Sequence, residues 1–160
     1  MKRFLMLAAV AAMALALAIP ASAKGPKSGQ DDSFTVGDAA VLGPVHVRGD
    51  VAQVHVRYSC DVGDHLWVSV KQSASGAVDP AVSADGSGFG GAASAWWQSH
   101  RGSFTCDGKR HVAWFAVDTL EPGSRGQLQS GSAWVQFCVT YGEDGLSAIR
   151  MQWSKVVTNH

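Results

Sequence analysis

The sequence is poor in several residue types that common functional classes need. Of its 160 residues, the only asparagine is Asn159, so no Asn-x-Ser/Thr glycosylation triplet occurs. Glu121 and Glu143 are the only glutamates, and both fall in predicted turns, which disfavours a glycosidase carboxylate pair. Lys and Arg (13) balance Asp and Glu (13) without a basic stripe, so we expect no nucleic-acid partner. These shortages disfavour several classes of function but do not identify one.

Long apolar runs are absent except at the start of the chain. Lys2 and Arg3 precede the uncharged run Phe4–Ile19, and small residues then end at Ala23. This is the pattern of a secretory signal peptide. The run is short for a bilayer span, which takes about 20 residues. We therefore predict a helical signal peptide over 1–23, cleaved after Ala23, and a secreted chain with no membrane span.

The chain has only three cysteines. Outside the cytoplasm cysteines tend to be oxidised, so we expect one disulfide and one residue left over. Cys60 and Cys106 each end a strand-like run in the same phase, which favours a bridge between them; Cys60–Cys138 is the alternative. Cys138 lies out of phase with its apolar neighbours. It is predicted to be the free thiol, either buried or available to link a dimer.

Two copies of the pattern Cys-Asp-x-x-x-His occur, at 60–65 and 106–111. Two thiolates and two imidazoles suit tetrahedral zinc. Oxidised cysteines would not bind it, so we expect no metal and no other cofactor. Each Asp–His pair is instead interpreted as a cross-strand charge pair.

Alternating apolar and polar residues dominate the rest of the chain. Such alternation predicts half-buried antiparallel strands, clearest over Val51–Cys60, and no helical period occurs after the signal peptide. If each Asp lies opposite its His, two hairpins form and Val112 and Trp114 face inward with Cys106. The alternative is that each run crosses between two sheets. We predict an all-β antiparallel two-sheet sandwich over 33–160, after a flexible leader over 24–32.

The strand ending Tyr58-Ser-Cys60, followed by Phe104-Thr-Cys-Asp-Gly and a Val/Trp-rich strand, resembles small secreted β-sandwich proteins of actinobacteria. The resemblance covers Val51–Val117. It implies an immunoglobulin-like fold and a Cys60–Cys106 bridge, and it implies no activity. Cys138 does not belong to the pattern.

One segment suggests recognition. Ser73–Arg101 is long and has little pattern until Trp96-Trp97. Adjacent strand residues point to opposite faces, so one indole could pack in the core while the other binds a ligand. The alternative is that both rings are covered.

The leading functional hypothesis is a non-catalytic extracellular module that binds an unknown protein or glycan through Trp96 or Trp97. One alternative is a small secreted hydrolase that uses loop Asp and His residues, with His65, His100 and His111 as candidates. A structural envelope component is the other alternative.

Overall fold

A computed structural model describes residues 37–84 and 92–160 of the chain. The predicted signal peptide, the predicted leader and the first four residues of the predicted domain lie outside the described residues. Among those described, no helix is both long and apolar enough to cross a membrane.

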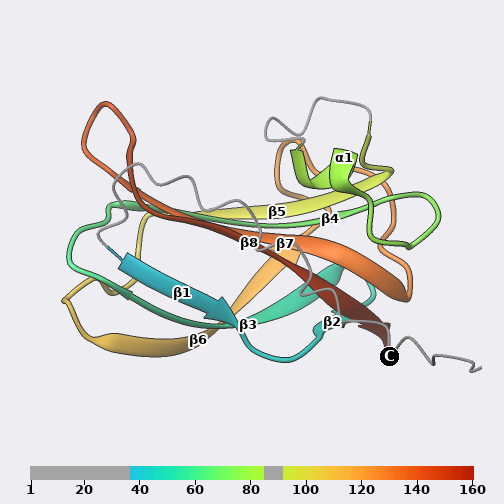
Figure 1. Ribbon diagram of the computed structural model, residues 1–160, viewed down its shortest axis with the longest axis horizontal. Coiled ribbons are helices and arrows are strands. Elements are labelled where there is room, and N and C mark those ends of the chain that lie inside the picture. Colours follow the sequence, from blue (N-terminus) through green and yellow to red (C-terminus); the bar gives the residue numbers. More distant parts are fainter. Residues whose placement is uncertain (1–36, 85–91) are drawn as a thin grey trace, which may run out of the picture.

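The described residues form eight strands and one short helix (Figure 1). β3 has the range that alternation predicted, Val51–Cys60. In chain order the elements are β1 (Gly37–Val41), β2 (Val45–Arg48), β3 (Val51–Cys60), β4 (His65–Gln72), α1 (Pro80–Ala84), β5 (Ala95–Arg101), β6 (Arg110–Asp118), β7 (Gly131–Tyr141) and β8 (Leu146–Asn159).

The strands close into a seven-stranded barrel. Their order is β1-β3-β2-β8-β7-β4-β5-β6, and β6 pairs back onto β3. β1 and β2 lie end to end, because both pair with the same strand: β1 with Val56–Cys60 and β2 with Val51–Gln53. The β2–β8 pair is parallel. The β5–β6 ladder consists of a single residue pair, Gln98 with Asp118.

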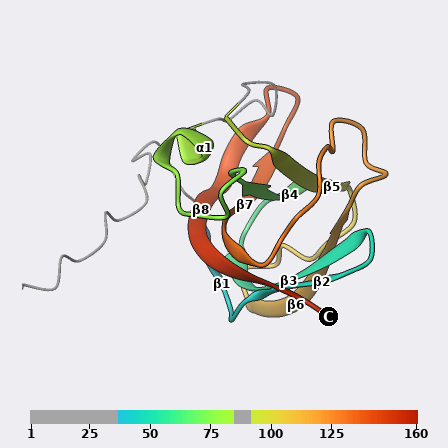
Figure 2. The same ribbon diagram turned by 90° about the vertical axis from the view of Figure 1, so that its right-hand side faces the viewer.

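The prediction of an immunoglobulin-like two-sheet sandwich is wrong. β3 and β6 pair through nine consecutive residues, which joins two strands that would belong to separate sheets in a sandwich. Figure 2 shows the strands curving around one interior. Alternation did not separate the two folds, because an inward-facing apolar side is common to both.

Of the two alternatives for the Cys-Asp-x-x-x-His runs, the hairpins are wrong. β3 does not pair with β4, whose neighbours are β5 and β7. The chain instead crosses from one side of the barrel to the other between Cys60 and His65. In the second copy of the pattern, β6 begins only at Arg110 and pairs with β3. As a result Val112 and Trp114 face outward, opposite to the prediction.

The barrel interior is an apolar core closed near one end by a disulfide. Cys60 and Cys106 are bonded, with their Cα atoms 4.8 Å apart, so the predicted pairing is confirmed. Both sulfurs pack with the core. The largest side chains inside are Trp97, Phe115, Phe137, Tyr58, Leu66 and Ile149.

A second cluster lies outside the barrel, where the segment after β4 folds over the outer faces of β4, β5 and β7 (Figures 1 and 2). The helix α1 in this segment starts with Asp79 as its N-cap and Pro80 at its first position, since Asp79 Oδ1 accepts a hydrogen bond from the Ala81 amide. The Trp134 indole donates to the Asp79 carbonyl oxygen at 2.9 Å, and Val82 is fully buried. The described part of this segment around α1 therefore covers the outer faces of β4, β5 and β7.

Candidate functional site

Both tryptophans predicted to bind a ligand are buried. Trp97 lies in the barrel core, is 0% exposed and donates its Nε1–H to the Gly126 carbonyl oxygen at 2.9 Å. Trp96 lies in the outer cluster, is 1% exposed and donates to Gln98 Oε1 at 3.0 Å. Of the two alternatives, the structure therefore shows the second, in which both rings are covered: Trp97 by the barrel core and Trp96 by Val82 and Ala93.

The histidines proposed for hydrolysis form pairs with acids or with each other. His111 Nε2 lies 2.7 Å from Asp107 Oδ1, so these two side chains are in contact as expected. The contact is not cross-strand, because Asp107 precedes β6. His100 Nδ1 lies 2.8 Å from Glu121 Oε1, and the His65 ring lies 5.3 Å from the His100 ring. In the described part of the chain no Ser or Thr hydroxyl is hydrogen-bonded to these imidazoles. They therefore lack the nucleophile–base contact that a hydrolytic triad needs.

The Asp107–His111 contact changes the acidity of the carboxyl group. The imidazole N–H donates to the carboxylate, which lowers the pKa of Asp107, and the Lys109 backbone N–H donates to the same oxygen. The first copy differs, because no ion pair joins Asp61 and His65 among the residues that the structure describes.

Cys138 is the free thiol, as predicted. Its side chain is buried on the outer side of β7, so the structure shows the first of the two alternatives for this residue. Burial raises the pKa of the thiol, although the charge of Arg150 and a hydrogen bond with Ser147 partly oppose it. A thiol in this environment is a weak nucleophile.

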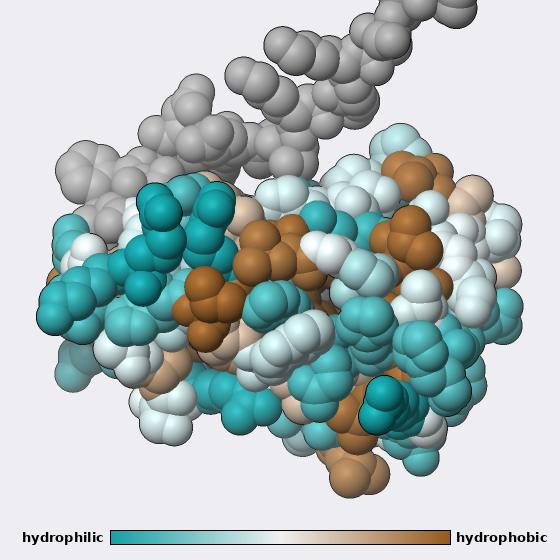
Figure 3. All heavy atoms as spheres, turned by 90° about the horizontal axis from the view of Figure 1, so that it is seen from below, coloured by the Kyte–Doolittle hydropathy of each residue, from teal (hydrophilic) through white to brown (hydrophobic). Residues whose placement is uncertain are grey.

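The outer face of β2, β3 and β6 carries large exposed side chains. Trp114 is 54% exposed and Val112 is 57% exposed, although both lie within a regular strand. Figure 3 views the molecule from the side of β3 and β6 and shows apolar patches among hydrophilic side chains. An exposed indole is costly in water and is typical of a contact surface.

The Trp114 ring is held in place by histidines from neighbouring strands. His55 lies directly opposite it in the β3–β6 ladder, and the two rings stack 4.2 Å apart at 5°. The His46 ring lies 6.0 Å away at 49°. The indole is therefore partly ordered before any ligand arrives, which reduces the entropy lost on binding.

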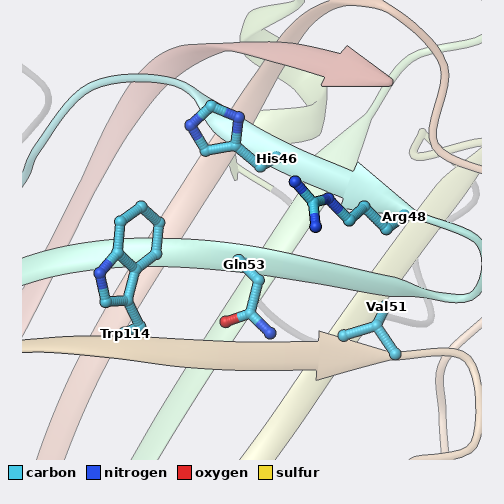
Figure 4. Close-up of a pocket in the computed structure, with 5 residues that line it drawn as sticks. All are labelled: His46, Arg48, Val51, Gln53 and Trp114. Atoms are coloured by element: carbon cyan, nitrogen blue, oxygen red, sulfur yellow. The ribbon is translucent and has the colours of Figure 1, made fainter. Parts of the chain in front are cut away.

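A recess of about 420 Å³ lies beside this ring. Figure 4 shows Gln53 between Trp114 at one end and Val51 and Arg48 at the other, with His46 above. These five residues line it, and we call it the Trp114 recess. Its volume is in the range of small-molecule sites, about 300–1,000 Å³.

Comparison of the chain with protein-family models and with curated proteins finds no match. The chemistry of the Trp114 recess must therefore be read from its own residues. Arg48 supplies a permanent positive charge, the amide of Gln53 can donate and accept, and none of the five lining residues is acidic.

The last residue of the chain extends this polar edge. His160 Nε2 lies 3.2 Å from His46 Nδ1, and Thr158 Oγ1 lies within hydrogen-bond distance of both nitrogens. The contact orients the His46 ring toward the recess. No group of three or more His, Cys, Asp or Glu residues suited to a metal ion gathers within residues 37–84 and 92–160.

The exposure of Trp114 could not be predicted from the sequence, because β6 is apolar on both faces. Phe115 and Val117 face the core, while Val112 and Trp114 face outward. Either set of alternate residues in β6 could face the core, so alternation could not show which of the two sets does. The usable signal was in β3, whose outward residues Gln53 and His55 are polar and lie beside β6.

Proposed function

We propose that the chain is a secreted, non-catalytic binding module whose ligand occupies the Trp114 recess. The observation that carries the proposal is a half-exposed indole, stacked on His55, at the edge of a recess of about 420 Å³. Ordered aromatic rings at concave surfaces supply large contact area at low entropic cost.

Two features support the extracellular part of the proposal. The Cys60–Cys106 disulfide is compatible with an oxidising compartment, where such bonds persist. The N-terminal pattern that ends at Ala23 is typical of exported proteins.

The residues that line the recess support binding over hydrolysis. The lining has no Ser, Cys, Asp or Glu side chain that could act as a nucleophile or as the orienting acid of a triad. The two His–carboxylate pairs, at Asp107–His111 and His100–Glu121, involve none of the residues that line it.

The test compares the secreted wild-type protein with Trp114→Ala on arrays of glycans and of extracellular proteins. Captured ligands are then measured by calorimetry. Leu120→Ala is the matched control, because Leu120 is 87% exposed and does not line the recess. We expect Trp114→Ala to weaken binding by about 30-fold, as for an aromatic residue worth about 2 kcal/mol, and the control to bind normally. Unchanged binding by Trp114→Ala would show that the ligand site lies elsewhere.

A further inference from the structure

We infer that the ligand of the Trp114 recess is an acidic saccharide, a sugar ring that carries a carboxylate or a sulfate group. This inference rests on the proposed function and adds the chemical class of the ligand. It depends on three properties of the recess: the exposed indole, the basic side chain of Arg48 and the position of the amide between them.

The indole fits the apolar face of a sugar ring. His55 covers one face of Trp114 at 4.2 Å, yet more than half of the side chain remains exposed. A ligand can therefore lie against the ring on the side away from His55. A pyranose presents C–H groups on one face, and stacking on an aromatic ring removes this apolar surface from water.

Among the five lining residues, the one with a permanent charge is basic. Arg48 is exposed and lies at the end away from Trp114. A guanidinium group recognises a carboxylate or sulfate through two parallel hydrogen bonds. His46, His55 and His160 add imidazole groups to the same side of the molecule.

The nearest acidic residues do not line the recess. Asp118 lies opposite Val51, but its Oδ1 accepts hydrogen bonds from the backbone N–H groups of Leu120 and Glu121. Asp50 lies in the turn between β2 and β3, outside the residues that line the recess. An anionic group beside Arg48 would therefore meet no carboxylate from the lining.

The order of the lining residues suits a sugar ring with polar substituents. Figure 4 places Gln53 between Trp114 and Arg48, where its amide can donate to one hydroxyl group and accept from another. A protein partner would need a broader apolar area with several buried anchors. On the outer face of β2, β3 and β6, the described large apolar residues that are exposed are Val51, Val112 and Trp114.

The experiment uses pairs of polymers that differ only in charge. Polygalacturonate is compared with its methyl ester, and dextran sulfate with dextran, by calorimetry with the secreted protein. We expect at least one acidic polymer to bind tenfold or more tightly than its neutral counterpart. We also expect this binding to weaken as salt concentration rises.

Two variants test what each end of the recess contributes to binding. Arg48→Gln removes the charge while keeping a polar side chain, so we expect the acidic and neutral polymers of a pair to bind within about twofold of each other. Trp114→Ala is expected to weaken both by tenfold or more. Arg150→Gln removes an exposed charge on β8 and is expected to bind like the wild type.

The outcomes separate the inference from the proposed function. Equal binding of charged and neutral polymers that depends on Trp114 overturns the acidic assignment and leaves the binding module intact. No binding of any polymer, together with a protein ligand lost in Trp114→Ala, overturns the saccharide class alone. If no ligand of either kind depends on Trp114, both statements are wrong.

Discussion

The buried Lys71 offers a quantitative test of how the outer cluster is stabilised. Its side chain is fully buried, and Nζ donates to Gln136 Oε1 at 3.1 Å and to the Ser83 carbonyl oxygen at 3.5 Å. Nζ also lies 5.0 Å from the Trp96 ring centroid. Gln136→Leu removes one acceptor from a buried ammonium group. Hydrogen bonds to charged groups contribute about 1.5–3 kcal/mol, so we expect a loss of about 2 kcal/mol in the free energy of unfolding.

Replacing the donor instead of the acceptor has a different effect on the free energy of unfolding. Lys71→Met keeps an unbranched side chain of similar length but removes the buried ammonium group with all of its contacts. It leaves the Gln136 amide oxygen without this donor, at a cost of about 1–3 kcal/mol. We therefore expect a loss of about 1–3 kcal/mol in the free energy of unfolding. The double variant Lys71→Met/Gln136→Leu lacks both the ammonium group and the amide. It should therefore be at least about 1 kcal/mol more stable than the sum of the two single effects predicts.

Urea unfolding of the disulfide-bonded protein, followed by tryptophan fluorescence, measures the three free energies. Gln129→Leu is the matched control, because this glutamine is exposed and its change should stay within about 0.5 kcal/mol. If the two single effects add to the double effect within about 0.5 kcal/mol, Lys71 and Gln136 are independent and the reasoning is refuted.

Three further predictions concern the cysteines and the Asp107–His111 pair. Replacing Cys60 and Cys106 by Ala opens a loop with a sequence separation of 46, so urea unfolding should show a loss of about 4 kcal/mol in the chain-entropy model. His111 lowers the folded pKa of Asp107 below its ordinary 3.8. The stabilisation is therefore complete above about pH 4 and lost as pH falls through the folded pKa, so melting curves of Asp107→Asn and wild type should differ at pH 7 and converge in acid. Burial raises the pKa of Cys138, so mass spectrometry should find one label per chain with iodoacetamide, added slowly in the native protein and rapidly in urea.

Each of these three predictions has a contradicting result. A loss below about 1 kcal/mol in the cysteine variant would show that the bridge constrains the unfolded chain little. A difference in melting temperature between Asp107→Asn and wild type that stays constant from pH 7 to pH 2 would show that the carboxylate charge does not stabilise the folded protein. Rapid labelling of Cys138 in the native protein would show that the thiol is accessible.

The local elements could be predicted because alternation is a local property of the chain. Val51–Cys60 has polar residues at every second position, so its ends and its inward face follow directly from the sequence. The shared phase of Cys60 and Cys106 likewise favoured their pairing. In each case one face of the segment is clearly more apolar than the other.

Closure of the barrel could not be predicted in this way. Whether β3 pairs with β4 or with β6 depends on contacts between distant segments, and both pairings keep Tyr58 and Val56 inside. The burial of Trp96 could not be predicted for the same reason. Its burial depends on the segment around Val82, which carries no periodic signal of its own.

The barrel is not equally well paired all the way round, because β5 and β6 are joined by a single residue pair. Besides Gln98–Asp118, the described contacts across this joint include a long hydrogen bond of 3.5 Å from Arg101 to the Ala116 carbonyl oxygen. The segment after β6 also contacts β5, because Trp96 and Arg125 exchange backbone hydrogen bonds and the Trp97 indole donates to the Gly126 carbonyl oxygen. Between the strands themselves, however, β5 and β6 share one residue pair, whereas β3 and β6 share nine. We therefore expect the β5–β6 ladder to open more readily than the β3–β6 ladder, with faster amide exchange there. Trp114 and His55 belong to the β3–β6 ladder, so their stacking can persist while the β5–β6 ladder opens and closes.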